Sequence, residues 1–125
     1  MILVDTSVWI DHFHRSDPVL VNLLHEDEIG AHPLVVEELA MGSLKARDDV
    51  LKHLSHLHQF PTLSHDELLA LVATRALRGR GLSPVDAHLL GSVMLVPGAS
   101  LWTRDKRLLR AADEHGVSFV EGDDG

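Results

Sequence analysis

The sequence predicts an α/β domain in which helices cover both faces of a parallel sheet. Two observations lead to this fold class. Short runs of apolar, β-prone residues recur along the chain, and segments with helical periodicity separate them. Strands and helices that alternate in this way form parallel sheets, because each helix carries the chain back to the end from which the next strand starts. We therefore expect a three-layer α/β/α fold with a parallel sheet of about five strands.

Five segments have the length and the residue types of strands, and they are residues 2–4, 29–31, 57–60, 100–102 and 117–120. Seven others repeat apolar residues at helical spacing, and they are residues 7–14, 18–25, 34–42, 46–56, 64–78, 84–96 and 105–115. In open parallel sheets the ligand-binding crevice lies at the carboxyl ends of the strands. Functional side chains are therefore expected directly after strands and at the starts of helices.

The length and composition of the chain predict one ordinary globular domain. With 125 residues the chain has the size of a single domain, and we expect one core over residues 1–125 without a linker. Apolar residues make up 45% of the sequence and charged residues 24%, which is typical of globular proteins. Only residues 121–125 are expected to form a flexible tail.

The sequence contains no cysteine. This excludes disulfides, zinc fingers and cysteine nucleophiles, so any metal ion must be held by oxygen or imidazole ligands. The first apolar stretch ends at Asp5, before a signal peptide has formed, and no later run approaches about 18 apolar residues. We therefore expect a cytoplasmic protein that does not enter a membrane.

The net charge of −8 argues against broad affinity for nucleic acid, because Lys and Arg drive the binding of phosphate. Two local basic strips stand out against this background. They are Arg75, Arg78 and Arg80 in one, and Arg104, Lys106, Arg107 and Arg110 in the other. Two interpretations stay open for each strip, which are contact with nucleic acid and a solvated helix face.

Three aspartates fall on the expected crevice side of the sheet. Asp5 directly follows the first strand, Asp105 lies shortly after the fourth, and Asp86 opens the sixth helix. Each also has a structural explanation, because an aspartate at a helix start caps free backbone amides. Ser83 and Asp86 have the spacing of a capping box. For each aspartate taken singly, capping and a functional site therefore remain alternatives.

A fourth acid, Glu38, is predicted to lie at the edge of a buried helix face. At about 100° per residue, the apolar side chains of the helix point on average about 50° away from Glu38, whereas Glu37 lies about 150° away. Glu37 is thus expected in solvent. A carboxylate at the inner edge is unfavourable unless something pairs with it, and a metal ion is one such partner.

Together the four acids indicate a site for a hard divalent cation. Mg²⁺ prefers carboxylate oxygen, and it is usually held by one or two carboxylates, by waters and by substrate phosphates. A metal ion in such a site can activate water and stabilise the charge on a scissile phosphate. The acids therefore point to phosphoryl chemistry.

Four short motifs carry a resemblance to a known family. They are Val4-Asp5-Thr6-Ser7, Glu38-Leu39-Ala40-Met41-Gly42, Leu82-Ser83-Pro84-Val85-Asp86-Ala87 and Leu101-Trp102-Thr103-Arg104-Asp105-Lys106. In order and spacing they resemble the four acidic motifs of PIN-domain nucleases, especially the bacterial VapC toxins. The resemblance spans nearly the whole chain.

The resemblance implies a metal-dependent endoribonuclease, the toxin of a toxin-antitoxin pair, that cleaves structured RNA with Mg²⁺ or Mn²⁺ as its cofactor. It also implies a homodimer, and inhibition by a small VapB-like antitoxin whose tail lies in the groove. Carried over position by position, it makes metal ligands of Asp5, Glu38 and Asp86, lets Asp105 complete the pocket, and makes supporting hydroxyls of Ser7 and Thr103.

Two other functions stay open. A receiver-like signalling module has a similar length and also holds Mg²⁺, but it requires a phospho-accepting aspartate after the third strand and a lysine after the last. Residues 57–61 and 117–120 offer neither. A catalytically silent PIN fold that only binds other proteins is the second alternative, and the presence of all four acids argues against it.

Overall fold

The computed structural model describes residues 1–121, so the tail predicted to be flexible lies outside the described residues except for Glu121. The strands are β1 (Ile2–Val4), β2 (Ile29–Ala31), β3 (His58–Gln59) and β4 (Ser100–Trp102). The helices are α1 (Thr6–His14), α2 (Pro18–His25), α3 (Pro33–Met41), α4 (Arg47–Ser55), α5 (His65–Thr74), α6 (Pro84–Met94) and α7 (Lys106–Glu114). Within residues 1–121 no helix is long and apolar enough to cross a membrane.

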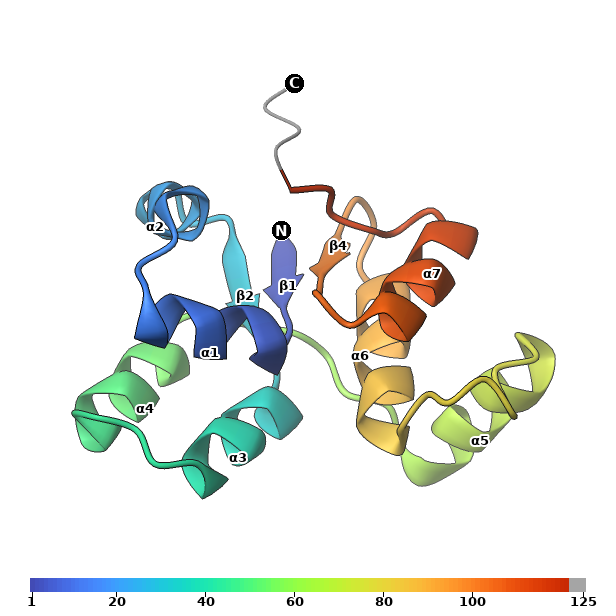
Figure 1. Cartoon of the computed structure of the whole chain (residues 1–125). Helices are drawn as coiled ribbons and strands as arrows, with labels where there is room; N and C mark the ends of the chain where they lie inside the picture. Colours follow the sequence, from blue (N-terminus) through green and yellow to red (C-terminus); the bar gives the residue numbers. More distant parts are fainter. Residues whose placement is uncertain (122–125) are drawn as a thin grey trace.

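The strands form one parallel sheet in the order β3-β2-β1-β4. The chain adds β2 and β3 on one side of β1 and later places β4 on the other side (Figure 1). The strand order therefore reverses between β1 and β4, and in open parallel sheets this reversal opens a crevice at the carboxyl ends of the strands. Asp5 and Thr103, the residues that directly follow these two strands, meet there.

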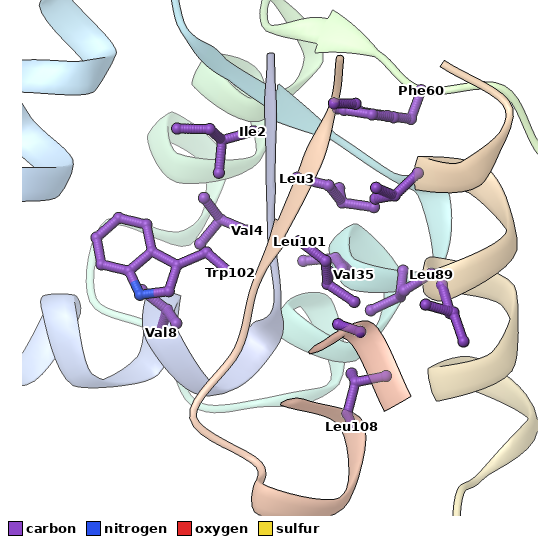
Figure 2. Packing of buried hydrophobic residues seen from close by; sticks show 14 of the residues in the cluster. Ile2, Leu3, Val4, Val8, Val35, Phe60, Leu89, Leu101, Trp102 and Leu108 are labelled. Atoms are coloured by element: carbon purple, nitrogen blue, oxygen red, sulfur yellow. The ribbon is translucent and has the colours of Figure 1, made fainter. Parts of the chain in front are cut away.

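β1 and β4 are buried apart from the half-buried Ser100, as expected for strands between two helical layers. Successive side chains of a strand point to opposite faces. Figure 2 shows on one face Ile2, Val4 and Trp102 with Val8 of α1, and on the other Leu3 and Leu101 with Leu89 of α6 and Leu108 of α7. The predicted α/β class is confirmed, and its core holds the two strands next to the crevice.

The fifth predicted strand, at residues 117–120, is wrong. This segment makes one isolated parallel bridge, between Leu101 and Ser118. The amide of Leu101 donates to the carbonyl of Val117 at 2.7 Å, and the amide of Phe119 donates to the carbonyl of Leu101 at 2.9 Å. The chain then leaves the edge of the sheet. Further on, the carboxylate of Glu121 accepts a hydrogen bond from Arg104, which lies outside the sheet.

The helix predicted at residues 64–78 is too long. α5 ends at Thr74, and the backbone of Ala76 has φ 52°, in the left-handed region that terminates a helix. Leu77 is nevertheless buried, and its amide donates to the carbonyl of Val72 at 3.0 Å. The apolar periodicity continues past the end of the helix because the turn folds Leu77 back into the core, which is why the sequence pattern overestimates the length.

Candidate active site

The crevice between β1 and β4 contains a buried carboxylate, Asp5, whose exposed fraction is 7%. Its Oδ2 atom accepts hydrogen bonds from Thr103 Oγ1 at 2.7 Å and from Ser7 Oγ at 3.1 Å. Its Oδ1 atom accepts from the amide of Thr6 at 2.7 Å, which caps α1. Both hydroxyls singled out from the sequence therefore contact this carboxylate, and they fix its orientation.

Thr6 connects Asp5 to Glu38. The hydroxyl Oγ1 of Thr6 donates to Glu38 Oε1 at 2.7 Å, which joins the first turn of α1 to α3. The sequence reasoning did not single out Thr6, although a hydroxyl next to Asp5 in a first helical turn was an available signal. The expected burial of Glu38 is wrong, because its side chain is exposed like that of Glu37. Its partner in this structure is a hydroxyl at the rim of the crevice.

Asp86 lies at the start of α6 in the predicted capping box. Its Oδ2 atom accepts from the amide of Ser83 at 3.0 Å, and Ser83 Oγ accepts from the amide of Asp86 at 3.1 Å. Burial raises the pKa of Asp86, and the negative charges of Asp105 and Asp5 raise it further, against the hydrogen bonds from Ser83 that lower it. Asp86 is therefore near enough to both other aspartates to be repelled by their charges.

Asp105 caps α7, and a bond to Thr103 links it to the crevice. Its Oδ1 atom accepts from the amides of Arg107 at 2.9 Å and Leu108 at 3.1 Å. Its own amide donates to Thr103 Oγ1 at 3.1 Å, and the same hydroxyl donates to Asp5. A single threonine thus holds two of the aspartates at the carboxyl end of β4.

The donor set matches a hard cation in its chemistry. Within residues 1–121, Asp86, Asp105 and Glu38 each keep one carboxylate oxygen that accepts no hydrogen bond from the protein. In the same residues no three acidic or histidine side chains are grouped so that they could hold a metal ion as they stand. Mg²⁺ does not require a complete protein cage, since waters and substrate phosphates supply the remaining oxygens. The residues therefore fit a cation that is bound by few carboxylates.

His32 follows β2 at the same end of the sheet, and the sequence reasoning did not consider it. Its ring is buried, with Nδ1 accepting from the amide of Leu34 at 3.0 Å and Nε2 lying 3.0 Å from Ser92 Oγ. Burial, together with the charge of His88, lowers the pKa of His32 to about 4. The imidazole is therefore neutral at physiological pH and ties α3 to α6.

Arg104, which the sequence assigned to a basic strip, is bound by acids of its own chain. Its guanidinium donates to Asp11 at 2.7 Å, to Asp17 at 2.7 Å and to Glu121 at 2.5 Å. Hydrogen bonds to these acids, that to Glu121 foremost, raise the pKa of Arg104. Its charge is therefore neutralised within the fold, which does not favour contact of Arg104 with nucleic acid.

The other residues of the two basic strips differ in where they lie. Four of them line one hollow of about 370 Å³, and they are Arg80, Lys106, Arg107 and Arg110. Arg75 and Arg78 are exposed and do not line it. The two strips seen in the sequence thus contribute unequally to one feature of the surface.

A second hollow, of about 460 Å³, lies beside Glu38. Ile10 and Phe13 of α1 form one wall, and Leu39 and Leu44 form part of the other. Ile10 and Phe13 are 43% and 37% exposed, which is high for large apolar side chains. The rim of the crevice is therefore apolar next to Glu38.

The fold and the crevice correspond to a known family. The sequence profile of the PIN domain matches residues 2–114, so the chain belongs to the PIN-domain family. Within that family it is of the VapC type, as the motifs predicted. It is 63% identical over 121 residues to Ribonuclease VapC32 of Mycobacterium tuberculosis, in strains CDC 1551 and H37Rv alike, and the alignment covers 97% of this chain and 98% of that protein.

A solved structure agrees with this fold. The crystal structure of the protein PAE2754 from Pyrobaculum aerophilum covers 94% of this chain and 87% of its own, with a TM-score of 0.66 and 18% sequence identity. At this identity the likeness concerns the fold alone. Membership of the PIN family does not favour the receiver-like alternative, and Phe60, not an aspartate, follows β3.

Proposed function

We propose that this chain is a metal-dependent endoribonuclease and the toxin of a toxin-antitoxin pair. The observation that carries the proposal is the meeting of Asp5, Asp86 and Asp105 at the point where the strand order reverses, in a chain 63% identical to Ribonuclease VapC32. A carboxylate such as Asp86, whose pKa is raised by burial and by two neighbouring acids, is typical of a functional site. The substrate is RNA, and the cofactor is Mg²⁺ or Mn²⁺.

The residues around the crevice have separate tasks. Asp5, Asp86, Asp105 and Glu38 are the candidate ligands, of which one or two would contact the cation directly and the others through water. Ser7 and Thr103 orient Asp5, because a ligand carboxylate held by hydrogen bonds loses little freedom on binding. When bound, the cation supplies a Lewis acid for in-line attack by water on the phosphodiester, which leaves 5′-phosphate and 3′-hydroxyl ends. No histidine base is required.

The partners in the proposal are a small VapB-like antitoxin and a second copy of the chain. The apolar hollow beside Glu38 supports an antitoxin that covers the crevice, because exposed apolar side chains at the rim of a site favour a protein partner. A homodimer is proposed from the family, and light scattering measures its mass. We place this activity in the cytoplasm, where the RNA is, and cell fractionation tests that location.

The test is a cleavage assay on total cellular RNA with purified, antitoxin-free protein. We expect cleavage with Mn²⁺ or Mg²⁺ and none in excess chelator. Asp5→Asn should lower the rate at least a hundredfold while the fold survives, because one oxygen of the site loses its charge. His56→Ala, at the exposed end of α4, is the matched control and should cleave like the parent. Undiminished cleavage in chelator would remove the metal from the proposal.

The same assay decides the remaining alternative, a silent PIN fold that only binds proteins. Such a protein would cleave no RNA under any metal condition, and Asp5→Asn would have no activity to change. Cleavage by the parent that is lost in Asp5→Asn excludes this alternative.

A further inference from the structure

We propose that Lys106, Arg107 and Arg110, which line one hollow together with Arg80, form a phosphate-binding site that holds the RNA strand beside the acidic crevice. The proposal rests on the proposed function for the identity of its ligand. Its observations are separate from the carboxylates, because they concern the hollow of about 370 Å³ that these four side chains line.

The first observation is the concentration of positive charge in a chain whose net charge is −8. Lys106, Arg107 and Arg110 make no ion pair within residues 1–121. They lie three and four residues apart on α7, where like charges repel and lower the stability of the helix. An arrangement that destabilises its own helix is explained by an anionic ligand that neutralises it.

The second observation is that the walls of the hollow are fixed to each other. The guanidinium of Arg80 makes two contacts with the carboxylate of Glu114, at 2.8 Å and 2.9 Å. This paired contact ties the loop before α6 to the last turn of α7. Arg80 is therefore neutralised by Glu114, and it holds the loop against the helix that carries the three other cations of the hollow.

The third observation is that Gly81 gives Arg107 its position. The φ of Gly81 is +76°, and a Cβ atom there would lie 2.5 Å from Arg107 Nη1 and 2.9 Å from Cδ and Cζ. The side chain of Arg107 therefore lies against the bare Cα of Gly81, in space that any other residue would fill. Gly79 has a similar φ of +72°, but a Cβ atom there would meet nothing within 4 Å.

The position of the hollow selects RNA as its ligand. Lys106 and Arg107 line the hollow and directly follow Asp105, the N-cap of α7, so the hollow begins next to this acid of the crevice. The loop that carries Arg80 and Gly81 leads directly to Ser83 and Asp86. A strand whose scissile phosphate lies at the carboxylates has further phosphates on either side. Carboxylates alone would repel that strand, and the cations next to them provide the attraction that the crevice lacks.

The experiment measures binding without cleavage. A fluorescent single-stranded RNA of about 12 nucleotides is titrated with protein in excess chelator, and anisotropy gives Kd at several salt concentrations. Arg107→Gln and Arg110→Gln should each weaken binding about tenfold near physiological salt and reduce the slope of log Kd against log salt by about 1. Arg75→Gln and Arg78→Gln remove the same charge outside the hollow and should change Kd less than twofold.

The two glycines test the geometry with no change of charge. Gly81→Ala and Gly79→Ala impose a similar backbone strain, but only Gly81→Ala displaces the guanidinium of Arg107. We expect Gly81→Ala to weaken RNA binding about threefold to tenfold and Gly79→Ala to leave it unchanged. Melting curves identify any variant that fails to fold, and Arg110→Gln, whose side chain is exposed, keeps the test decisive in that case.

Three outcomes would overturn the proposal. Equal losses in all four arginine variants would mean diffuse attraction instead of a site, and unchanged Kd in Arg107→Gln and Arg110→Gln would mean no contact. A polyglutamate peptide that binds more weakly to Gly81→Ala, while RNA does not, would assign the hollow to an acidic protein. Cleavage is measured separately with Mn²⁺. A parent that binds RNA as expected but cleaves none refutes the nuclease and not the hollow.

Discussion

The aspartates of the crevice each use one carboxylate oxygen to cap a helix. Asp5 and Asp105 each use Oδ1 for the cap, and Asp86 uses Oδ2. The second oxygen of each carboxylate is left for another partner, which for Asp5 is Thr103. From the sequence alone, capping and function were alternatives, because a sequence does not show that the two oxygens of one carboxylate have different partners. The cap is also what aims the side chain.

At the level of one residue, Asp86 tests whether the acids of the crevice lie together at a cation site. Its raised pKa means that the charged form is disfavoured in the folded state, so its ionisation lowers stability at neutral pH. Asp86→Asn keeps the acceptor for Ser83 and removes the charge. In chelator we expect the variant to melt at the same temperature as the parent or higher. With Mn²⁺ the parent should gain about 2.7 kcal/mol at a hundredfold excess over Kd, and the variant should gain much less.

Glu67→Gln is the matched control for Asp86→Asn. Glu67 occupies the same position in the capping box of Ser64 on α5, but its pKa is lowered by the hydrogen bonds from Ser64. Its neutralisation should lower the melting temperature slightly or leave it unchanged, and it should not alter the shift caused by Mn²⁺. Equal shifts with Mn²⁺ in the parent and in Asp86→Asn would remove Asp86 from the site.

His32 predicts a loss of stability on acidification. With a folded pKa of about 4 against an ordinary value of 6.5, the ring stays neutral in the fold while the unfolded chain takes up a proton. Stability should therefore fall as the pH drops from about 6.5 to about 4, by up to about 3 kcal/mol at this site. His32→Asn keeps a cap for α3 and cannot titrate, so its stability should depend less on pH in urea unfolding. His53→Asn, at an exposed position, should retain the slope of the parent.

Side-chain environments were harder to predict from the sequence than side-chain identities. Three of the acids could be chosen because strand ends and helix starts fix their location, whereas the two hydroxyls followed from the family resemblance. The helical angle of Glu38 predicts the direction of its side chain but not how deeply the side chain is buried, and in the structure it is exposed. Arg104 binds Asp11 and Asp17, which lie 93 and 87 positions before it in the sequence. No local pattern encodes contacts over such separations.

Among the elements, three of the strands and one helix were predicted best. β1, β2, β4 and α2 have the expected bounds, because strong apolar patterns and a proline at the start of α2 define them. Errors fall where burial continues without regular structure. Leu77 keeps helical spacing in a turn, and residues 117–120 have strand-like side chains but only one bridge. The sequence pattern reports burial, and regular backbone pairing is a separate property.

Arg104 connects elements that otherwise contact each other little, so its loss should lower stability. It binds Asp11 of α1, the N-cap Asp17 of α2 and Glu121 near the end of the chain. Arg104→Gln leaves Asp17 partly buried without its cation, and we expect a loss of about 1 to 2 kcal/mol in urea unfolding. Arg78→Gln, at an exposed position without an ion pair in residues 1–121, should stay within about 0.5 kcal/mol of the parent.

The loss of stability in Arg104→Gln should depend on pH because of Asp17. Burial alone would raise the pKa of Asp17, but hydrogen bonds from Arg104 and from the amides of Leu20 and Val19 lower it below 3.8. A lowered acid pKa contributes stability above the unfolded value, and this contribution disappears as the pH falls through the folded one. The difference between the parent and Arg104→Gln should therefore narrow below about pH 4. A difference that is constant down to pH 2.5 would mean that Asp17 is not its source.

At the scale of the whole molecule, a local cationic hollow lies in a chain of net negative charge. The excess of acid gives −8 overall, while the cationic hollow lies at α7. α2 and α4 lie on the opposite side of the sheet from α7 (Figure 1). An RNA strand therefore meets attraction at short range and repulsion at long range. The balance between the two depends on the Debye length, which is about 30 Å at 0.01 M salt and about 8 Å at 0.15 M.

The contrast between short-range attraction and long-range repulsion predicts that acids far from the hollow weaken RNA binding only at low salt. Asp48 and Asp49 are exposed at the start of α4, and two unit charges about 20 Å apart in water interact by about 0.2 kcal/mol. Summed over two acids and several phosphates, the repulsion comes to about 1 kcal/mol. The double variant Asp48→Asn with Asp49→Asn should bind the fluorescent RNA about threefold more tightly at 0.01 M salt and no more tightly at 0.15 M. Asn22→Asp, which adds an exposed acid on α2, should have the opposite effect at low salt and none at high salt. Equal effects at both salt concentrations would mean that α4 contacts the RNA directly, because screening leaves only short-range interactions in 0.15 M salt.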